Sequence, residues 1–230
     1  MRRIVCLFLL LCVPSVLFAS DIPVFFSEEI VVTALRRVQP LGESSSQVKV
    51  ISSKDIGRTG AKTVSEVLRS VAEVNIKSTG GLGGISTLRL KSASSSQVLL
   101  LVDGQKMNSS LLGVFDMNDI LLSNVERIEI AEDSLSSVYG ADALGGVINI
   151  ITKGSSGKPV AVSVNYGSFG ESGTSISVGQ SVSDLSFRAF YQDLKSNGYR
   201  QNSDYKNTGY GLAADWSDLV SLKYNITNSE

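Results

Sequence analysis

The sequence predicts an α+β domain with a mixed sheet, followed by the first antiparallel strands of an incomplete transmembrane β-barrel. Strand and helix signals alternate over residues 45–153, which indicates the α+β domain. Residues 158–230 instead carry five runs in which apolar and polar side chains alternate strictly, joined by connections of unequal length. This combination is typical of an outer-membrane barrel. A soluble β-sandwich also alternates in this way and stays the alternative.

The α+β domain is predicted from short local signals. Thr63 and Glu66 form a capping-box pattern that opens a short helix. Residues 98–102 are uniformly apolar, which predicts a strand buried on both faces that ends at the turn pair of residues 103–104. Further strands are predicted at residues 48–51, 74–77, 87–90, 128–130 and 147–151.

Each run of the second part places its apolar residues on one strand face. The apolar rows lie at residues 160–166, 176–178, 185–191, 210–216 and 220–226. The connections are medium at residues 167–172, tight at 181–184, long and polar at 193–206, and tight at 216–218. Tight turns on one side and longer loops on the other, with aromatic residues near strand ends, favour the barrel.

The N-terminus has the layout of a secretory signal. A basic pair at residues 2–3 precedes an apolar run at residues 4–18, which ends at small residues around Ala19. The run is too short for a lasting membrane span, so residues 1–20 are predicted to be a signal peptide cleaved after Ala19. Lipoprotein processing at Cys12 is the alternative.

Composition excludes several functional classes. Both cysteines lie in the predicted signal, so the mature chain offers no thiol chemistry, and there is no histidine. A net charge of −1 does not provide the excess of basic residues that nucleic-acid binding requires. No apolar stretch after the N-terminal run reaches 18 residues, which excludes a helical membrane protein. We expect no enzyme, cofactor or metal centre. Calcium is an alternative at oxygen-rich positions whose spacing matches no calcium motif: Asp193, Asn197, Asn202, Asp204 and Asp215.

Four motifs in order resemble those of one known family. Residues 29–34 (EIVVTA) are similar to a TonB box, and residues 99–105, 124–130 and 136–153 are similar to plug signatures. The chain is identified on these motifs as a member of the TonB-dependent outer-membrane receptor family, in the branch that takes up cobalamin and catecholate siderophores. The likeness is nearly continuous over residues 29–153 and looser beyond.

The resemblance implies a division of the chain and a function. Residues 1–20 would be the signal peptide, 21–44 a periplasmic leader with the TonB box, 45–153 the plug domain, and 158–230 a partial barrel. Such a receptor takes up a scarce nutrient, cobalamin or a ferric siderophore, across the outer membrane. Its partners would be TonB of the inner-membrane energy-transducing complex, outer-membrane lipid and the small ligand.

Five strands cannot close a barrel, because bacterial barrels have even strand numbers from eight upward. We therefore expect the chain to be a fragment or a truncated product that does not transport by itself. The alternative function is a short plug-like periplasmic binding module that competes for TonB.

The predicted TonB-binding residues suit pairing with a partner's sheet edge. Such β-augmentation depends on backbone hydrogen bonds, and β-branched residues favour the extended conformation that it needs. The alternative is that this apolar island is the first plug strand. The predicted residues are Glu29, Ile30, Val31, Val32, Thr33 and Ala34.

The resemblance also implies two sets of functional residues within the plug. Gly80, Gly81, Gly83 and Gly84 are candidates for an apical loop that contacts the ligand, with a plain flexible connection as the alternative. Among the plug-motif residues, those of 126–129 are expected to organise charge, with a solvated strand face as the alternative. The full set is Arg89, Asp103, Gly104, Glu126, Arg127, Glu129, Tyr139, Gly140, Gly145, Gly146 and Asn149.

Three positions depart from the family pattern. Residues 72–74 (AEV) replace Pro-Gly-Val, Lys91-Ser92 replaces an Arg-Gly pair, and residues 131–133 (AED) stand where Arg-Gly-Pro is usual. Two glycines and an arginine that help lock the plug to the barrel are thus missing, so plug docking is expected to differ in this chain.

Overall fold

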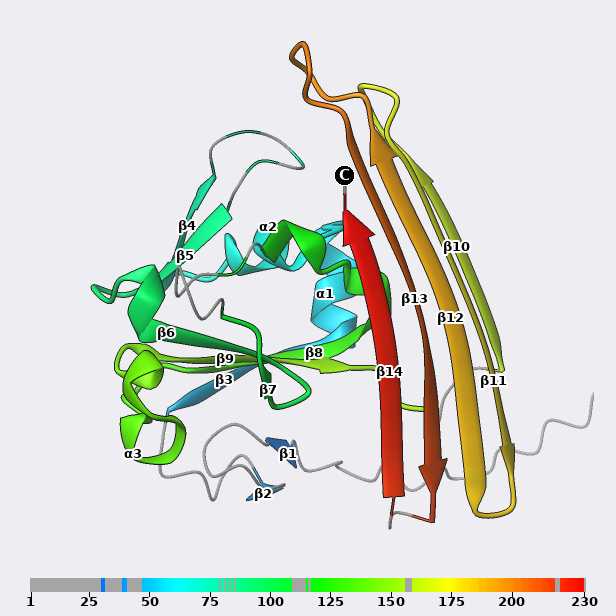
Figure 1. Ribbon diagram of the computed structural model, residues 1–230, viewed down its shortest axis with the longest axis horizontal. Helices are drawn as coiled ribbons and strands as arrows, with labels where there is room; N and C mark the ends of the chain where they lie inside the picture. Colours follow the sequence, from blue (N-terminus) through cyan, green and yellow to red (C-terminus); the bar gives the residue numbers. More distant parts are fainter. Residues whose placement is uncertain are drawn as a thin grey trace, which may run out of the picture.

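The computed structural model of the 230-residue chain describes residues 30–31, 39–40, 47–78, 80, 82, 84, 86–108, 115, 117–155, 159–217 and 220–229. Two bodies lie side by side (Figure 1): a domain built around a mixed sheet, and a tall curved sheet that we call the wall. The predicted signal peptide lies outside the described residues. No helix in the described part of the chain is long and apolar enough to cross a membrane.

The first domain is built on a five-stranded sheet with the order β3-β8-β9-β6-β7. Strand β9 pairs in parallel with β6 and antiparallel with β8, so the predicted mixed sheet is confirmed. The strands are β3 (Val48–Ser52), β6 (Val98–Val102), β7 (Gln105–Lys106), β8 (Val125–Ala131) and β9 (Gly146–Thr152).

Short helices and a hairpin surround this sheet. Helix α1 (Ser53–Thr59) begins where the Ser52 hydroxyl accepts a hydrogen bond from the backbone N–H of Asp55, and it ends at Gly60 with a φ of +66°. The remaining elements are α2 (Val64–Leu68), the hairpin of β4 (Val74–Ser78) and β5 (Ser86–Leu90), and α3 (Ser136–Tyr139). Short 3-10 turns lie at Ser95–Gln97, Met117–Asp119, Leu122–Asn124 and Ala141–Ala143.

The capping box predicted at the start of α2 forms only in part. Glu66 accepts a hydrogen bond from the backbone N–H of Lys62 at 2.8 Å, one residue earlier than the motif requires. The Thr63 hydroxyl makes no capping bond and lies 3.0 Å from the Ser65 hydroxyl. Thr63 also forms an isolated β-bridge with Leu121, which fixes its backbone from outside the helix.

Both faces of the central sheet are buried. One face packs under α1 and α2, where Leu68, Ile128 and Ile148 are fully excluded from solvent. The other face packs against the segment of α3 through Leu99 and Leu101, among others. The prediction that residues 98–102 are buried on both faces is therefore confirmed for all but the half-buried Val102.

The wall is an antiparallel meander in which each strand pairs with the next in sequence. All five predicted strands are present, but β12 and β13 extend further than predicted. The expected connection of residues 193–206 shrinks to 197–204, because its ends pair across the two strands. The strands are β10 (Val160–Tyr166), β11 (Ser172–Val182), β12 (Leu185–Ser196), β13 (Tyr205–Trp216) and β14 (Val220–Ser229).

The register of the wall aligns its apolar residues into rows on the outer face. Val162 lies opposite Ile176, Ile176 opposite Tyr191, and Tyr191 opposite Tyr210, and all four side chains are exposed. The inner face carries buried polar residues such as Arg188 and is directed toward the first domain (Figure 1). The sandwich alternative is wrong, because a sandwich buries its apolar face.

The first domain is expected to fold without the wall, since its core is formed by its own helices and sheet. A recombinant protein of residues 45–153 should give a dispersed amide spectrum. Leu68→Ala removes a fully buried side chain and should lower the free energy of unfolding by about 2–5 kcal/mol. Leu144→Ala is the matched control because Leu144 is 51% exposed, and it should change stability by less than about 1 kcal/mol. A collapsed wild-type spectrum would show that the domain depends on the wall.

Candidate functional site at the interface between the plug and the wall

Asp103 is a junction between the first domain and the wall. It forms a two-residue turn with Gly104, and both residues have positive φ, as the Asp-Gly pair predicts. The Asp103 carboxylate accepts hydrogen bonds from the backbone N–H and the hydroxyl of Thr152 at 3.0 and 2.5 Å. From β14, the Lys223 ammonium donates to Asp103 Oδ1 at 3.0 Å and to the Thr152 carbonyl at 2.9 Å. One lysine of the wall thus binds the β6–β7 turn and the end of β9.

A second group of contacts joins β12 to the turn before β8. Arg188 donates to Asn124 Oδ1 at 2.7 Å, and Ser123 hydrogen-bonds Gln192. Lys153, which follows β9, donates to the Ser123 carbonyl at 2.7 Å. Burial lowers the pKa of the Lys153 ammonium below its usual value, and the Arg188 charge lowers it further.

One ion pair and one hydrogen-bonded pair of residues also join the first domain to the wall. Lys62, ahead of α2, forms an ion pair with Glu171 at the start of β11. Asp215 on β13 accepts hydrogen bonds from Ser155, including one from its backbone N–H at 3.0 Å. The apolar part of the interface is small by comparison: Leu121 packs with Leu194 and Tyr205 of the wall.

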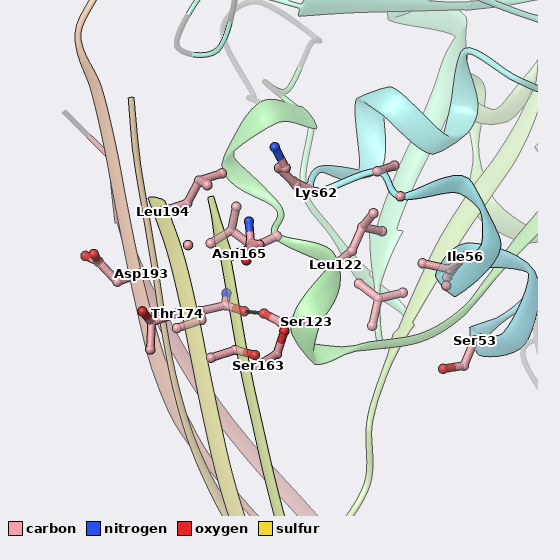
Figure 2. A pocket seen from close by; sticks show the side chains of 18 of the residues that line it. Ser53, Ile56, Lys62, Leu122, Ser123, Ser163, Asn165, Thr174, Asp193 and Leu194 are labelled. Atoms are coloured by element: carbon pink, nitrogen blue, oxygen red, sulfur yellow. Dashed lines mark hydrogen bonds between the residues drawn. The ribbon is translucent and has the colours of Figure 1, made fainter. Parts of the chain in front are cut away.

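A cavity of about 360 Å³ separates α1 from the inner face of β10–β12. Figure 2 shows Ile56 and Leu122 on the side of the first domain, and Ser163, Asn165 and Thr174 on the wall side. The wall side is polar, so water can occupy the gap between the two bodies.

Comparison with known proteins assigns the first domain. The model of the TonB-dependent receptor plug domain matches residues 40–147. The vitamin B12 transporter BtuB of Vibrio cholerae is 40% identical over 158 residues, which is 68% of this chain and 26% of the transporter. BtuB of Photobacterium profundum is 36% identical over 66% of this chain and 24% of its own length. The chain belongs to the TonB-dependent receptor family. Its aligned part spans about a quarter of these relatives.

Solved receptor structures share the fold of both bodies. The ferripyoverdine receptor of the outer membrane of Pseudomonas aeruginosa superposes with a TM-score of 0.75 at 16% identity, over 87% of this chain and 27% of the receptor. The siderophore receptor PiuA from Acinetobacter baumannii gives 0.68 at 21% identity, over 83% and 28%. The first domain is therefore a plug, and β10–β14 are barrel strands.

The structure places only part of the predicted TonB box. Ile30–Val31 form β1, which pairs antiparallel with β2 (Gln39–Pro40). Glu29, Val32, Thr33 and Ala34 lie outside the described residues, so the box stays a prediction.

The predicted apical glycines are also described in part. Gly81 and Gly83 lie outside the described residues. A Cβ atom at Gly84 would lie 2.9 Å from the backbone nitrogen of Gly80, which explains a glycine there. The paired ends of β4 and β5 point to the same end of the molecule as the long β12–β13 connection (Figure 1).

The charged plug-motif residues of β8 form one cluster, and Glu129 lies on the sheet face that turns away from α1 and α2. Arg127 donates to Glu129 at 2.9 Å, and Glu129 is fully buried opposite Asn149. Glu126 is exposed and lies 3.6 Å from Arg127. A solvated strand face thus describes Glu126 but not Glu129. Asn149 Oδ1 accepts a hydrogen bond from the backbone N–H of Gly104 at 3.3 Å.

The remaining motif residues have mainly structural surroundings. A Cβ atom at Gly145 would overlap the Cβ atom of Ala93, and one at Gly146 would lie 2.5 Å from the Ala131 carbonyl oxygen. The glycine pair therefore allows β9 to start against its neighbours. Gly140 follows the end of α3, which includes Tyr139, while Arg89 is exposed on β5.

The departures from the family pattern create ion pairs within the plug. Lys91 lies 2.8 Å from Glu132, whose side chain is only 7% exposed. This hydrogen bond raises the pKa of the Lys91 ammonium. Asp133 accepts a hydrogen bond from the backbone N–H of Gln47 at 2.9 Å. The charges at these positions are thus satisfied without the wall.

Sequence reasoning missed the interface residues Lys62, Lys153, Arg188 and Lys223. Arg188 and Lys223 could have been found, since each occupies a polar position in the apolar–polar alternation of its strand and is therefore expected on the inner face. For the acidic positions proposed for calcium, the described residues contain no group of three or more acidic side chains that could hold a metal. Asp193 instead accepts a hydrogen bond from Thr208, and Asp215 those from Ser155.

Lys223→Ala is expected to loosen the plug from the wall, because it removes two charge-assisted contacts and leaves Asp103 with less compensation. The loss should be about 1–3 kcal/mol. We would measure urea-induced plug release in the natural protein in detergent, with a fluorophore at Ser137→Cys on the exposed plug surface. Lys206→Ala removes an exposed lysine from β13 and is the control. Equal release midpoints for the two variants would contradict a role for Lys223.

Proposed function

We propose that the natural protein is an outer-membrane receptor that takes up a scarce small molecule, either cobalamin or a ferric siderophore. The 40% identity with the vitamin B12 transporter carries this proposal, because it extends over 68% of this chain. The relatives are named as transporters and receptors, which supports transport rather than catalysis. The predicted signal peptide would direct export.

The outer face of the wall supports a membrane location. Large apolar side chains such as Val162, Leu212 and Leu222 are exposed in aligned rows. Exposed apolar surface of this extent is costly in water and favourable against lipid. The same surface argues against the alternative of a water-soluble periplasmic module that competes for TonB.

The polar interface supports gating by the plug. Apolar contact is concentrated at Leu121, Leu194 and Tyr205, whereas the other contacts are hydrogen bonds and ion pairs that water can replace. A plug held in this way can move without exposing a large apolar core. Energy coupling through residues 29–34 completes the proposal. In the part of this segment that the structure describes, the strand is paired at two positions, and such a short pairing is easily exchanged for a partner's sheet edge.

Uptake by whole cells tests the function. Cells without their own cobalamin receptor, expressing the natural protein, should accumulate radiolabelled cyanocobalamin or one member of a panel of ferric siderophores. Accumulation should disappear in a strain without TonB. Failure to accumulate any of these ligands, with the protein present in the outer membrane, would contradict the proposal.

The coupling segment has a test of its own. Val32→Pro removes a backbone donor and restricts the neighbouring residue, so it should abolish binding of a peptide of residues 27–38 to the periplasmic domain of TonB. Val32→Ala keeps every backbone group and should weaken binding only slightly. Equal losses would indicate a side-chain pocket. Unchanged binding of both variants would show that the box lies elsewhere.

A further inference from the structure

A second cavity, of about 250 Å³, lies between the plug and the inner face of β10–β12. We call it the cationic cavity, because Lys153 of the plug and Arg188 of the wall both line it. Four serines from the plug and two wall strands also line it: Ser123, Ser163, Ser175 and Ser177. The cavity thus combines two cations with a set of hydroxyl groups.

Arg188 is buried and Lys153 is half-buried, and both use few of their donors. Arg188 is 8% exposed, donates to Asn124 at 2.7 Å, and holds its guanidinium carbon 5.3 Å from the centre of the Phe190 ring. Lys153 donates to the Ser123 carbonyl at 2.7 Å. Both acceptors are neutral. A guanidinium carries five N–H donors and an ammonium three, so most of the donors are available to a ligand.

Neither cation has an acidic partner at ion-pair distance among the described residues, although the Glu126 carboxylate attracts the Lys153 ammonium from further away. Within the described ranges, no carboxylate oxygen lies within 4.0 Å of the charged nitrogens of Lys153 or Arg188. By contrast, Lys62 and Lys223 at the same interface each have an acidic partner. Two like charges in a partly dry site repel each other and cost free energy unless an anion compensates them.

We propose that the cationic cavity binds one small free oxyanion of the size of phosphate or sulfate, held between Lys153 and Arg188. The serine hydroxyls would donate further hydrogen bonds to its oxygens. The lining decides the class of ligand, because its two cations and its hydroxyl groups are donors that the oxygens of a tetrahedral anion accept. The larger cavity of Figure 2 shares four lining residues with this one and provides a route of entry.

The bound ion bridges the two bodies, since Lys153 belongs to the plug and Arg188 to the wall. It replaces the repulsion between the two cations with two attractive contacts. Because the ion binds only the docked arrangement, it stabilises docking by a free energy that rises with the logarithm of its concentration once the site is saturated.

Equilibrium dialysis with radiolabelled inorganic phosphate tests the site in the natural protein in detergent. Chloride keeps the ionic strength constant, so general screening does not change. We expect saturable binding of about one phosphate per chain, with competition by sulfate. Lys153→Gln and Arg188→Gln should each weaken the affinity about tenfold, as expected for loss of one charge-assisted contact. Arg188→Lys keeps the charge and should retain most of the binding.

Lys195→Gln is the matched control, because Lys195 lies on β12 but is exposed and paired with Asp193. It should bind phosphate like the wild type. If Arg188→Gln does not fold, Lys153→Gln and Arg188→Lys still decide the question. The proposal is wrong if the wild type shows no saturable binding, or if Lys195→Gln loses as much affinity as Lys153→Gln. Dialysis is independent of uptake, so a failure of the proposed transport function would leave this result unaffected.

Discussion

The polarity of the wall determines how the plug is held. Strands β10–β14 direct their apolar residues outward, so their inner face has mostly polar groups to offer the plug. Contact is therefore made through pairs such as Lys223 with Asp103 and Arg188 with Asn124. These contacts are directional and individually modest, in contrast to the continuous apolar core inside the plug. The internal stability of the plug and its attachment to the wall thus depend on different kinds of interaction.

The plug has balanced its own charges where it departs from the family pattern. Lys91 and Glu132 stand at two of these positions and pair with each other, and the fully buried Glu129 is bonded to Arg127. A charge that finds its partner inside one body does not have to be matched across the interface. At the interface, by contrast, the hydrogen-bond acceptors of Lys153 and Arg188 among the described residues are neutral.

The sequence predicts those features that arise from local periodicity. The five wall strands and the strand at residues 98–102 follow from side-chain alternation and from a continuous apolar run. Helix α1 was not predicted, because Ile56 is its only buried residue and Gly57 lies within it. The interface pairs were also missed, since Lys62 and Glu171 are 109 residues apart and no local pattern connects them. The predicted ends of β12 and β13 were wrong because the polar residues there form hydrogen-bonded pairs between the two strands. Such pairing depends on strand register and cannot be seen in the composition.

The strand order of the plug has a consequence for the timing of its assembly. Strand β9 lies in the middle of the sheet but comes last among the strands of the plug, and its parallel partner β6 lies more than forty residues earlier in the chain. Closing such a long segment costs entropy before any pairing compensates it. The two halves, β3-β8 and β6-β7, have no direct hydrogen-bonded connection until β9 is inserted between them. A chain that is synthesised from its N-terminus therefore completes the plug sheet only when Thr152 is available. Strand β10 begins a few residues later, so completion of the plug sheet and the start of the wall are neighbouring events in folding.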